Sequence, residues 1–165
     1  MYNGRKRHHA LKYQSCILWN GIIIHLSDVY EGKKHDISIL RKPKLIAKIE
    51  EQQELHLEKR LFVYGDPGYK VGRHILSPYN TTEENLFNRC MASYRICVEW
   101  GFGKMIKDWA FLDFYKNLKL KLQQVPTMYR VGVLLSNIRF CYYSNQTAIA
   151  FEISTPTIHE YLNKI

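Results

Sequence analysis

The sequence lacks cysteine and histidine pairs at the spacing of zinc ligands. Its four cysteines (Cys16, Cys90, Cys97 and Cys141) include no C-x-x-C, and none of its seven histidines forms a pair of zinc-ligand spacing. We therefore expect neither a zinc site nor a disulfide framework. Cys90 and Cys97 are seven residues apart in an expected helix, so we predict that both pack as small apolar side chains.

Long hydrophobic runs are also missing. The longest apolar stretch, Cys16–Leu26, is broken by Asn20 and Gly21 and is far too short to span a bilayer. The segment Met1–His9 shows no secretory leader, and no repeat or Pro/Ser-rich linker divides the chain. We expect a single intracellular domain with no membrane partner.

Acidic residues are scarce. The chain has 15 Asp and Glu against 24 Lys and Arg, a net charge of +9 and a pI near 9.4. This balance favours an anionic partner, most commonly nucleic acid, although a solvated basic protein without such a partner fits the composition as well. Two basic clusters could contact DNA phosphates, and the first could equally serve in nuclear import or be plain solvated charge. They are Arg5, Lys6 and Arg7, and Lys116, Lys119 and Lys121.

The pattern of apolar residues and turn signals predicts a mixed α/β order. Asn20-Gly21 between two β-branched runs predicts a hairpin, because both residues tolerate positive φ. Asp36 is a candidate N-cap for a helix that is interrupted near Pro43 and resumes to Glu58. The remaining expected elements are a short buried strand at 61–64, a loop from 67 to 79, a helix from 82 to about 102 opened by a Thr81/Glu84 capping box, and a helix over 127–143.

Two acids stand out as candidate metal ligands. Asp66 follows the expected strand at a tight turn, and Glu99 lies on the expected helix 33 residues later. A carboxylate at the end of a strand and one on a helix beside it can hold a divalent metal over a phosphodiester. Each also has a simpler reading: Asp66 as an acidic turn residue, and Glu99 as the ion-pair partner of Arg95.

The helical wheel over 82–102 leaves one narrow polar strip. Most of the circumference is apolar, so we predict a mostly buried helix whose polar seam faces water, a ligand or another polar group. The seam holds Asn88, Ala92, Arg95 and Glu99.

Five segments resemble the DDE-superfamily endonucleases of the Harbinger transposase group and their transposase-derived relatives. They are Tyr2–Gln14 (YNGRKRHHALKYQ), Glu31–Asp36 (EGKKHD), Tyr64–Tyr69 (YGDPGY), Arg95–Gly103 (RICVEWGFG) and Leu134–Asn137 (LLSN), in the family's order. The resemblance implies an RNase H-like fold, a mixed sheet flanked by helices, with a metal-bound acidic triad. By position, Asp66 corresponds to the second acid and Glu99 to the third.

The first acid of that triad has no counterpart here. In the family it lies on a central strand shortly before the segment matched by Tyr2–Gln14, so we expect an N-terminally truncated domain over 1–143 and a C-terminal tail over 144–165. Loss of this strand should leave unpaired backbone groups on Leu61–Tyr64. Asp36 is a conceivable substitute, although capping its own helix explains it. With Asp66 and Glu99 alone, we expect at most one weakly held Mg²⁺ or Mn²⁺.

The resemblance thus implies a fragment of a metal-dependent DNA endonuclease or transposase, inactive as it stands. DNA, a second copy of the chain or an accessory DNA-binding protein are the expected partners, in the nucleus. The alternative is a non-catalytic, domesticated DNA- or protein-binding module that keeps the acids for stability.

Overall fold

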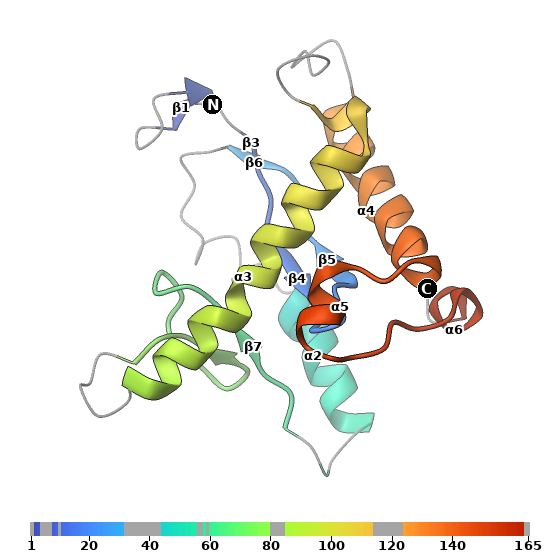
Figure 1. Ribbon diagram of the computed structural model, residues 1–165. Helices are drawn as coiled ribbons and strands as arrows, with labels where there is room; N and C mark the ends of the chain where they lie inside the picture. Colours follow the sequence, from blue (N-terminus) through green and yellow to red (C-terminus); the bar gives the residue numbers. More distant parts are fainter. Residues whose placement is uncertain are drawn as a thin grey trace. The chain divides into compact units, whose positions relative to one another are not determined.

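The computed structural model of the protein describes residues 2–3, 8–9, 11–31, 44–55, 58, 60–79, 85–113 and 124–163 (Figure 1). The chain forms two compact units. The first comprises Met1–Gln14 and Ser27–Arg95, and the second Ser15–Leu26 and Ile96–Ile165. The described residues form both helices and short two-stranded sheets, so the mixed α/β class is confirmed.

The described part of the first unit contains three strand pairs, one whole helix and the start of a second helix, up to Arg95. Two pairs are antiparallel and one is parallel. The predicted helix up to Glu58 is observed as α2, Lys44–Leu55, while its proposed cap Asp36 lies outside the described residues. The strands are β1 (Tyr2–Asn3) with β2 (His8–His9), β3 (Leu11–Lys12) with β6 (Tyr30–Glu31), and β7 (Val63–Tyr64) with β8 (Ile75–Leu76).

The hairpin predicted at Asn20-Gly21 is present in the second unit. Strands β4 (Ser15–Ile17) and β5 (Ile23–Leu26) pair antiparallel. Gly21 has φ +86°, and its N–H donates to the Leu18 carbonyl over 2.9 Å. The Asn20 side chain accepts from the Ile22 N–H at 3.2 Å. Only the glycine uses positive φ, so Asn20 acts through its side chain instead.

The strand predicted at 61–64 is shorter and less buried than expected. Only Val63–Tyr64 form β7, both half-buried, and Phe62 is 45% exposed. Its partner β8 lies in the segment predicted as loop. The Val63 and Gly65 N–H groups donate to the carbonyls of His74 and Leu76, at 2.9 and 2.8 Å. One edge of β7 is therefore paired, and no other described strand pairs with its second edge.

Helix α3 spans Asn85–Asp108, six residues past the predicted end at Phe102. The prediction of a mostly buried helix is wrong. Its buried positions form a single stripe with a spacing of four residues, Cys97, Gly101 and Met105, while Leu86 and Ile96 are 74% and 40% exposed. Apolar composition all round a helix predicts burial only where neighbouring elements cover every side, and here the described neighbours cover one. Cys97 is buried as expected, whereas Cys90 is exposed. The proposed capping box at Thr81 lies outside the described residues.

The second unit is built around α4, Val125–Tyr142, close to the predicted 127–143 and with Pro126 in its first turn. Its core includes Met105, Leu112 and Phe140, which are 0%, 0% and 3% exposed. A Cβ on Gly132 would lie 2.5 Å from Leu112 Cδ1, so the glycine allows this close approach. Three short helices complete the unit: η1 (Ala110–Leu112), α5 (Gln146–Ala150) and α6 (Ile158–Leu162).

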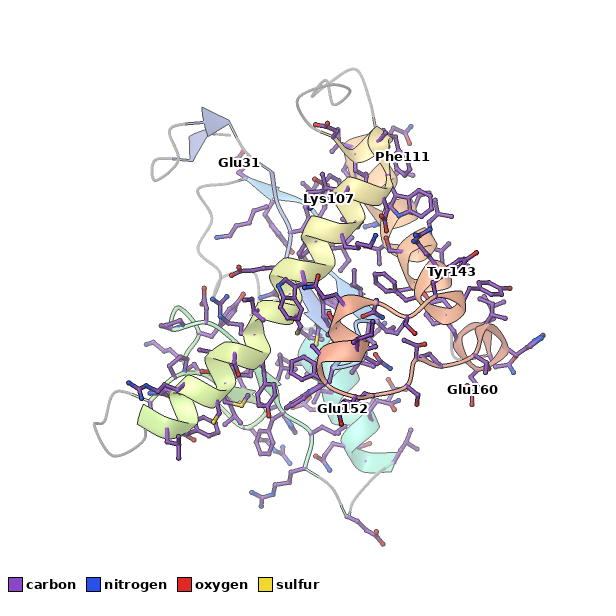
Figure 2. The ribbon with its side chains drawn as sticks, viewed as in Figure 1. Glu31, Lys107, Phe111, Tyr143, Glu152 and Glu160 are labelled. Carbon is purple, nitrogen blue, oxygen red and sulfur yellow. The ribbon has the colours of Figure 1, made fainter. Side chains whose placement is uncertain are left out.

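The segment after α4 is ordered by specific caps. Asn145, 5% exposed, accepts from the Ala148 N–H at 2.9 Å to cap α5 and donates to the Asn20 carbonyl at 2.8 Å. Tyr143, labelled in Figure 2, directly follows α4. Glu160, also labelled, lies in α6 and completes a capping box with Thr157. None of the described helices is both long and apolar enough to cross a membrane.

Candidate functional site

Asp66 lies two residues beyond β7, in a turn that its own carboxylate helps to close. The Gly68 N–H donates to Asp66 Oδ1 at 2.9 Å, and the Tyr69 N–H donates to the Asp66 carbonyl at 3.0 Å. The side chain is half-buried, and its second oxygen, Oδ2, has no hydrogen-bond or ion-pair partner in the described part of the chain. The turn thus orients a carboxylate with one oxygen still available.

The turn is fastened to the N-terminal segment through Tyr69. The Gln14 side-chain amide donates to the Tyr69 hydroxyl at 2.7 Å. A Cβ on Gly65 would lie 2.5 Å from the Tyr69 ring, so the ring packs directly over the backbone that precedes Asp66. Two segments that resemble the DDE endonucleases are joined here by a contact that sequence reasoning did not predict.

Tyr64, the last residue of β7, lies beside an aromatic pair. Its ring meets that of Phe87 edge-on, at 6.3 Å between centroids, and Phe87 also contacts Tyr79 at 5.4 Å. Burial raises the pKa of the Tyr64 phenol, and the guanidinium of Arg95 offsets part of that shift. The hydroxyl is buried and has no hydrogen-bond partner among the described residues. This contact attaches the start of α3 to the strand that leads to Asp66.

Glu99 lies on α3 with an exposed side chain, and Arg95, one turn earlier, is half-buried. Both residues make polar interactions. Asp66 belongs to the first unit and Glu99 to the second, so each is described within its own unit. Across the described residues, no three His, Cys, Asp or Glu side chains are grouped so that they could hold a metal ion.

Asn137, in α4, forms three side-chain hydrogen bonds within the second unit. Its Oδ1 accepts from the Ile23 N–H at 3.0 Å, and its Nδ2 donates to the Ile23 carbonyl at 2.9 Å and to the Tyr161 hydroxyl at 3.0 Å. The neighbouring Ser136 hydroxyl accepts from the Trp109 indole N–H at 2.9 Å. Ser136 and Asn137 are 1% and 2% exposed, so both are buried and satisfied.

Sequence reasoning used these two residues only as part of a resemblance and missed their structural role. The available signal was a Ser-Asn pair inside an apolar helical run, since buried polar side chains normally carry specific hydrogen bonds. The other candidates cannot be compared in this way, because Asp36 and the two basic clusters at 5–7 and 116–121 lie outside the described residues.

Comparison with protein families decides the ancestry of these segments. A family model described as DDE superfamily endonuclease matches residues 1–137. The chain belongs to this family. Endonucleases of the DDE superfamily act on DNA and generally use divalent metal ions, and the matched region includes Asp66, Glu99 and Asn137. Comparison with curated proteins gave no match, and comparison with solved structures gave none either.

The donor chemistry of a DDE metal site is only partly represented here. Hard divalent cations prefer carboxylate oxygens, which the available Oδ2 of Asp66 and the exposed carboxylate of Glu99 provide. The donor types therefore fit. The donor number does not, since the described residues contain no group of three ligands.

Proposed function

We propose that this chain is part of the catalytic domain of a Harbinger-type DNA endonuclease with an RNase H-like fold. Family membership over 1–137 supports a nuclease origin, and the YGDPGY and RICVEWGFG segments support the subgroup. Under this proposal Asp66 and Glu99 are the second and third acids of the triad. DNA would be the substrate, and the protein would act on it in the nucleus.

Each residue has a defined task in this proposal. Asp66 and Glu99 would ligate Mg²⁺ or Mn²⁺, and Arg95 would orient Glu99 or contact a phosphate of the DNA. Two such ions, when bound, activate a water molecule and stabilise the leaving oxygen of a phosphodiester. The triad's first acid has no counterpart in the 165 residues, so the chain alone would hold one ion weakly and cut DNA poorly or not at all.

The observation that carries the proposal is the carboxylate geometry at Asp66. The Gly68 N–H holds Oδ1 at 2.9 Å, while Oδ2 has no partner among the described side chains and backbone groups. For a role in the turn alone, the hydrogen bond from the Gly68 N–H to Oδ1 would be sufficient. A ligand also needs an oriented oxygen left over, which the half-buried turn supplies.

Manganese binding tests these roles directly. Titration of Mn²⁺ followed by electron paramagnetic resonance should show one weak site in the chain, and Asp66→Asn and Glu99→Gln should each weaken it about tenfold or more. Glu51→Gln, an exposed position on α2 with the same charge change, is the matched control.

Two outcomes would contradict the proposal. Equal Mn²⁺ affinity in Asp66→Asn and in the Glu51→Gln control would remove Asp66 from metal binding. Salt-sensitive DNA binding with no manganese site would favour the non-catalytic binding module instead.

A further inference from the structure

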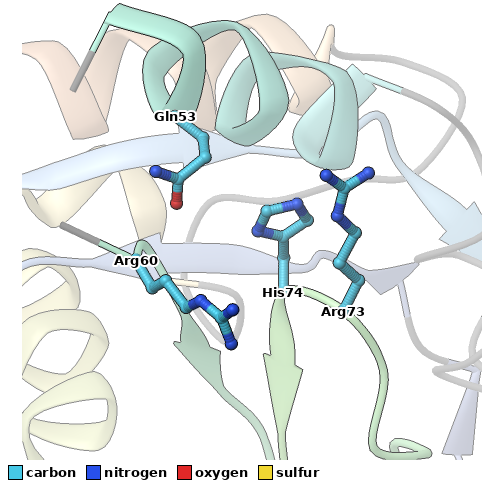
Figure 3. A pocket seen from close by; sticks show the side chains of 4 residues that line it. All are labelled: Gln53, Arg60, Arg73 and His74. Atoms are coloured by element: carbon cyan, nitrogen blue, oxygen red, sulfur yellow. The ribbon is translucent and has the colours of Figure 1, made fainter. Parts of the chain in front are cut away.

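A basic cavity of about 300 Å³ lies in the first unit, and Asp66 is not among its described lining residues. It is lined by Gln53, Arg60, Arg73 and His74, which come from α2, the approach to β7 and the approach to β8. Figure 3 shows Arg60 and Arg73 on either side of His74, with Gln53 facing them from the helix. None of the four lining residues is acidic.

Backbone groups of Leu61 fix two walls of this cavity. The Leu61 N–H donates to Gln53 Oε1 at 2.8 Å, and the Leu61 carbonyl lies 3.1 Å from His74 Nδ1. His74 is further held by the hydrogen bond from the Val63 N–H to its carbonyl, at 2.9 Å. The amide and the imidazole therefore keep fixed positions without any ligand.

His74 supplies a polar atom that lacks a partner. The residue is 6% exposed, and its Nε2 is buried without a hydrogen bond in the described structure. Because the Leu61 carbonyl can only accept, Nδ1 carries the proton that faces it, and Nε2 is the ring nitrogen left available to a ligand. Burying such an atom without a partner is unfavourable, and a ligand that enters the cavity would remove that cost.

Arg60 and Arg73 add two positive charges at the same cavity. Both side chains are exposed, and neither guanidinium has a carboxylate partner within the described residues. A guanidinium presents a planar fork of donors that matches the oxygens of phosphate. Two forks and an imidazole around a small cavity are suited to a tetrahedral dianion.

We propose that this cavity binds a terminal phosphate group. Its volume is at the small end of ligand cavities, roughly 300–1,000 Å³, and suits a phosphate with little attached to it better than a duplex. The phosphate could belong to a free small molecule or to the 5′ end of a DNA strand. Metal binding at Asp66 and Glu99 is not required, so the inference is independent of the proposed nuclease function.

The test uses the full chain in EDTA, which removes any contribution of divalent metal. Inorganic phosphate is titrated by calorimetry against the wild type, Arg60→Gln and Arg73→Gln. Arg89→Gln is the matched control, an exposed arginine of the same unit that does not line the cavity. We expect saturable binding that each cavity variant weakens about tenfold and that the control leaves within about twofold.

A second pair of titrations identifies the source of the phosphate. DNA duplexes with a 5′-phosphate and with a 5′-hydroxyl are compared on the same proteins. Tighter binding of the phosphorylated duplex, lost in Arg60→Gln and Arg73→Gln, assigns the site to a DNA end. Equal binding of the two duplexes, together with specific binding of inorganic phosphate, assigns it to a small phosphate compound.

Two results would overturn the proposal. One is the absence of saturable phosphate binding by the wild type. The other is equal weakening by Arg60→Gln, Arg73→Gln and Arg89→Gln, which would mean that only the net charge matters. Circular dichroism spectra and melting temperatures that match the wild type exclude unfolding of a variant as the cause.

Discussion

At the residue scale, the side chain of Asn137 links three elements of the second unit through hydrogen bonds. Its side chain binds both backbone groups of Ile23 and the hydroxyl of Tyr161. Asn137 lies in α4 and its partner residues lie in β5 and α6, so one amide joins the hairpin, the long helix and the last described helix of the second unit. Ile23 itself is 4% exposed, and water cannot replace the amide there.

Replacing Asn137 with leucine tests this role. The substitution keeps the branched shape of the side chain but leaves the buried Ile23 N–H and carbonyl without the Asn137 amide, so we expect a loss of about 2–4 kcal/mol in the free energy of unfolding. Urea denaturation followed by circular dichroism measures the loss. Gln146→Leu, at an exposed position of α5, should change stability by less than about 0.5 kcal/mol. Equal effects of the two substitutions would contradict the assignment.

The cysteines differ in their expected reactivity, because Cys90 is exposed whereas Cys16 is half-buried. Burial and the neighbouring Cys97 raise the pKa of Cys16 to about 11, and burial raises that of Cys97, while Cys90 is exposed. Iodoacetamide attacks the thiolate, so at pH 8 we expect Cys90 to be labelled well before Cys16 in the folded protein. The rate at Cys16 should rise as the pH approaches 11. Mass spectrometry of tryptic peptides gives the order, and the chain unfolded in urea is the control. Simultaneous labelling of both residues in the folded chain would contradict the structure.

The sequence identifies residues of special chemistry better than it identifies their contacts. The turn at Asp66 follows from Pro67-Gly68 alone, because these residues favour chain reversal. The bonds from Gln14 to Tyr69 and from Asn137 to Ile23 do not follow, since their partners are 55 and 114 residues apart. Contacts of that separation depend on the packing of whole elements, which local patterns do not encode.

At the element scale, α3 shows how one residue type can mislead a boundary prediction. Gly101 and Gly103 indicated a bend or an end, yet the helix continues to Asp108. Gly101 is buried, and a Cβ there would lie 2.9 Å from Ile17 Cδ1. The glycine therefore allows the hairpin strand β4 to approach the helix closely, and that packing outweighs its poor helix propensity.

The two glycines of α3 form a matched pair for mutation. A Cβ on Gly103 would have no neighbouring atom within 4 Å, so Gly103→Ala should raise the free energy of unfolding by about 0.5–1 kcal/mol through helix propensity. Gly101→Ala gains the same propensity but must displace the end of the Ile17 side chain, so its net effect should be lower by about 1 kcal/mol or more. Thermal unfolding of both variants measures the difference. A larger stabilisation from Gly101→Ala would contradict this packing.

The strand pairs show what short-range signals can and cannot predict. The hairpin β4–β5 follows from Asn20-Gly21, because the turn and both strands are adjacent in sequence. Strand β8 was missed since it is two residues long and pairs parallel with β7 across a connection of ten residues, 65–74. A parallel partner supplies no turn motif that would mark it.

At the scale of the whole molecule, the family and the net charge favour action on DNA, whereas the small number of grouped metal ligands among the described residues disfavours cleavage. The family match and the charge of +9 favour a protein that works on DNA. The described residues, however, contain no group of three metal ligands. A protein with this combination should bind DNA through phosphate contacts more readily than it cuts DNA.

Plasmid nicking in Mg²⁺ measures that difference. We expect the 165-residue chain to bind plasmid DNA in a salt-sensitive manner and to nick it no faster than Asp66→Asn does. Added Mn²⁺ should not change the result, because the ligand number and not the metal limits the site. Nicking by the wild type that disappears in Asp66→Asn would show that the chain contains a complete triad. Asp36→Asn would then be the first variant to compare.

The hydrogen bond between Asn137 and Tyr161 also limits where the C-terminus can be shortened for recombinant production. The family match stops at residue 137, which makes that position an attractive end point for recombinant production. A protein cut there would lose Tyr161, as well as the Asn145 amide that holds the Asn20 carbonyl beneath the hairpin turn. The shortened product should be poorly soluble, because residues beyond the family match complete hydrogen bonds that hold the second unit together.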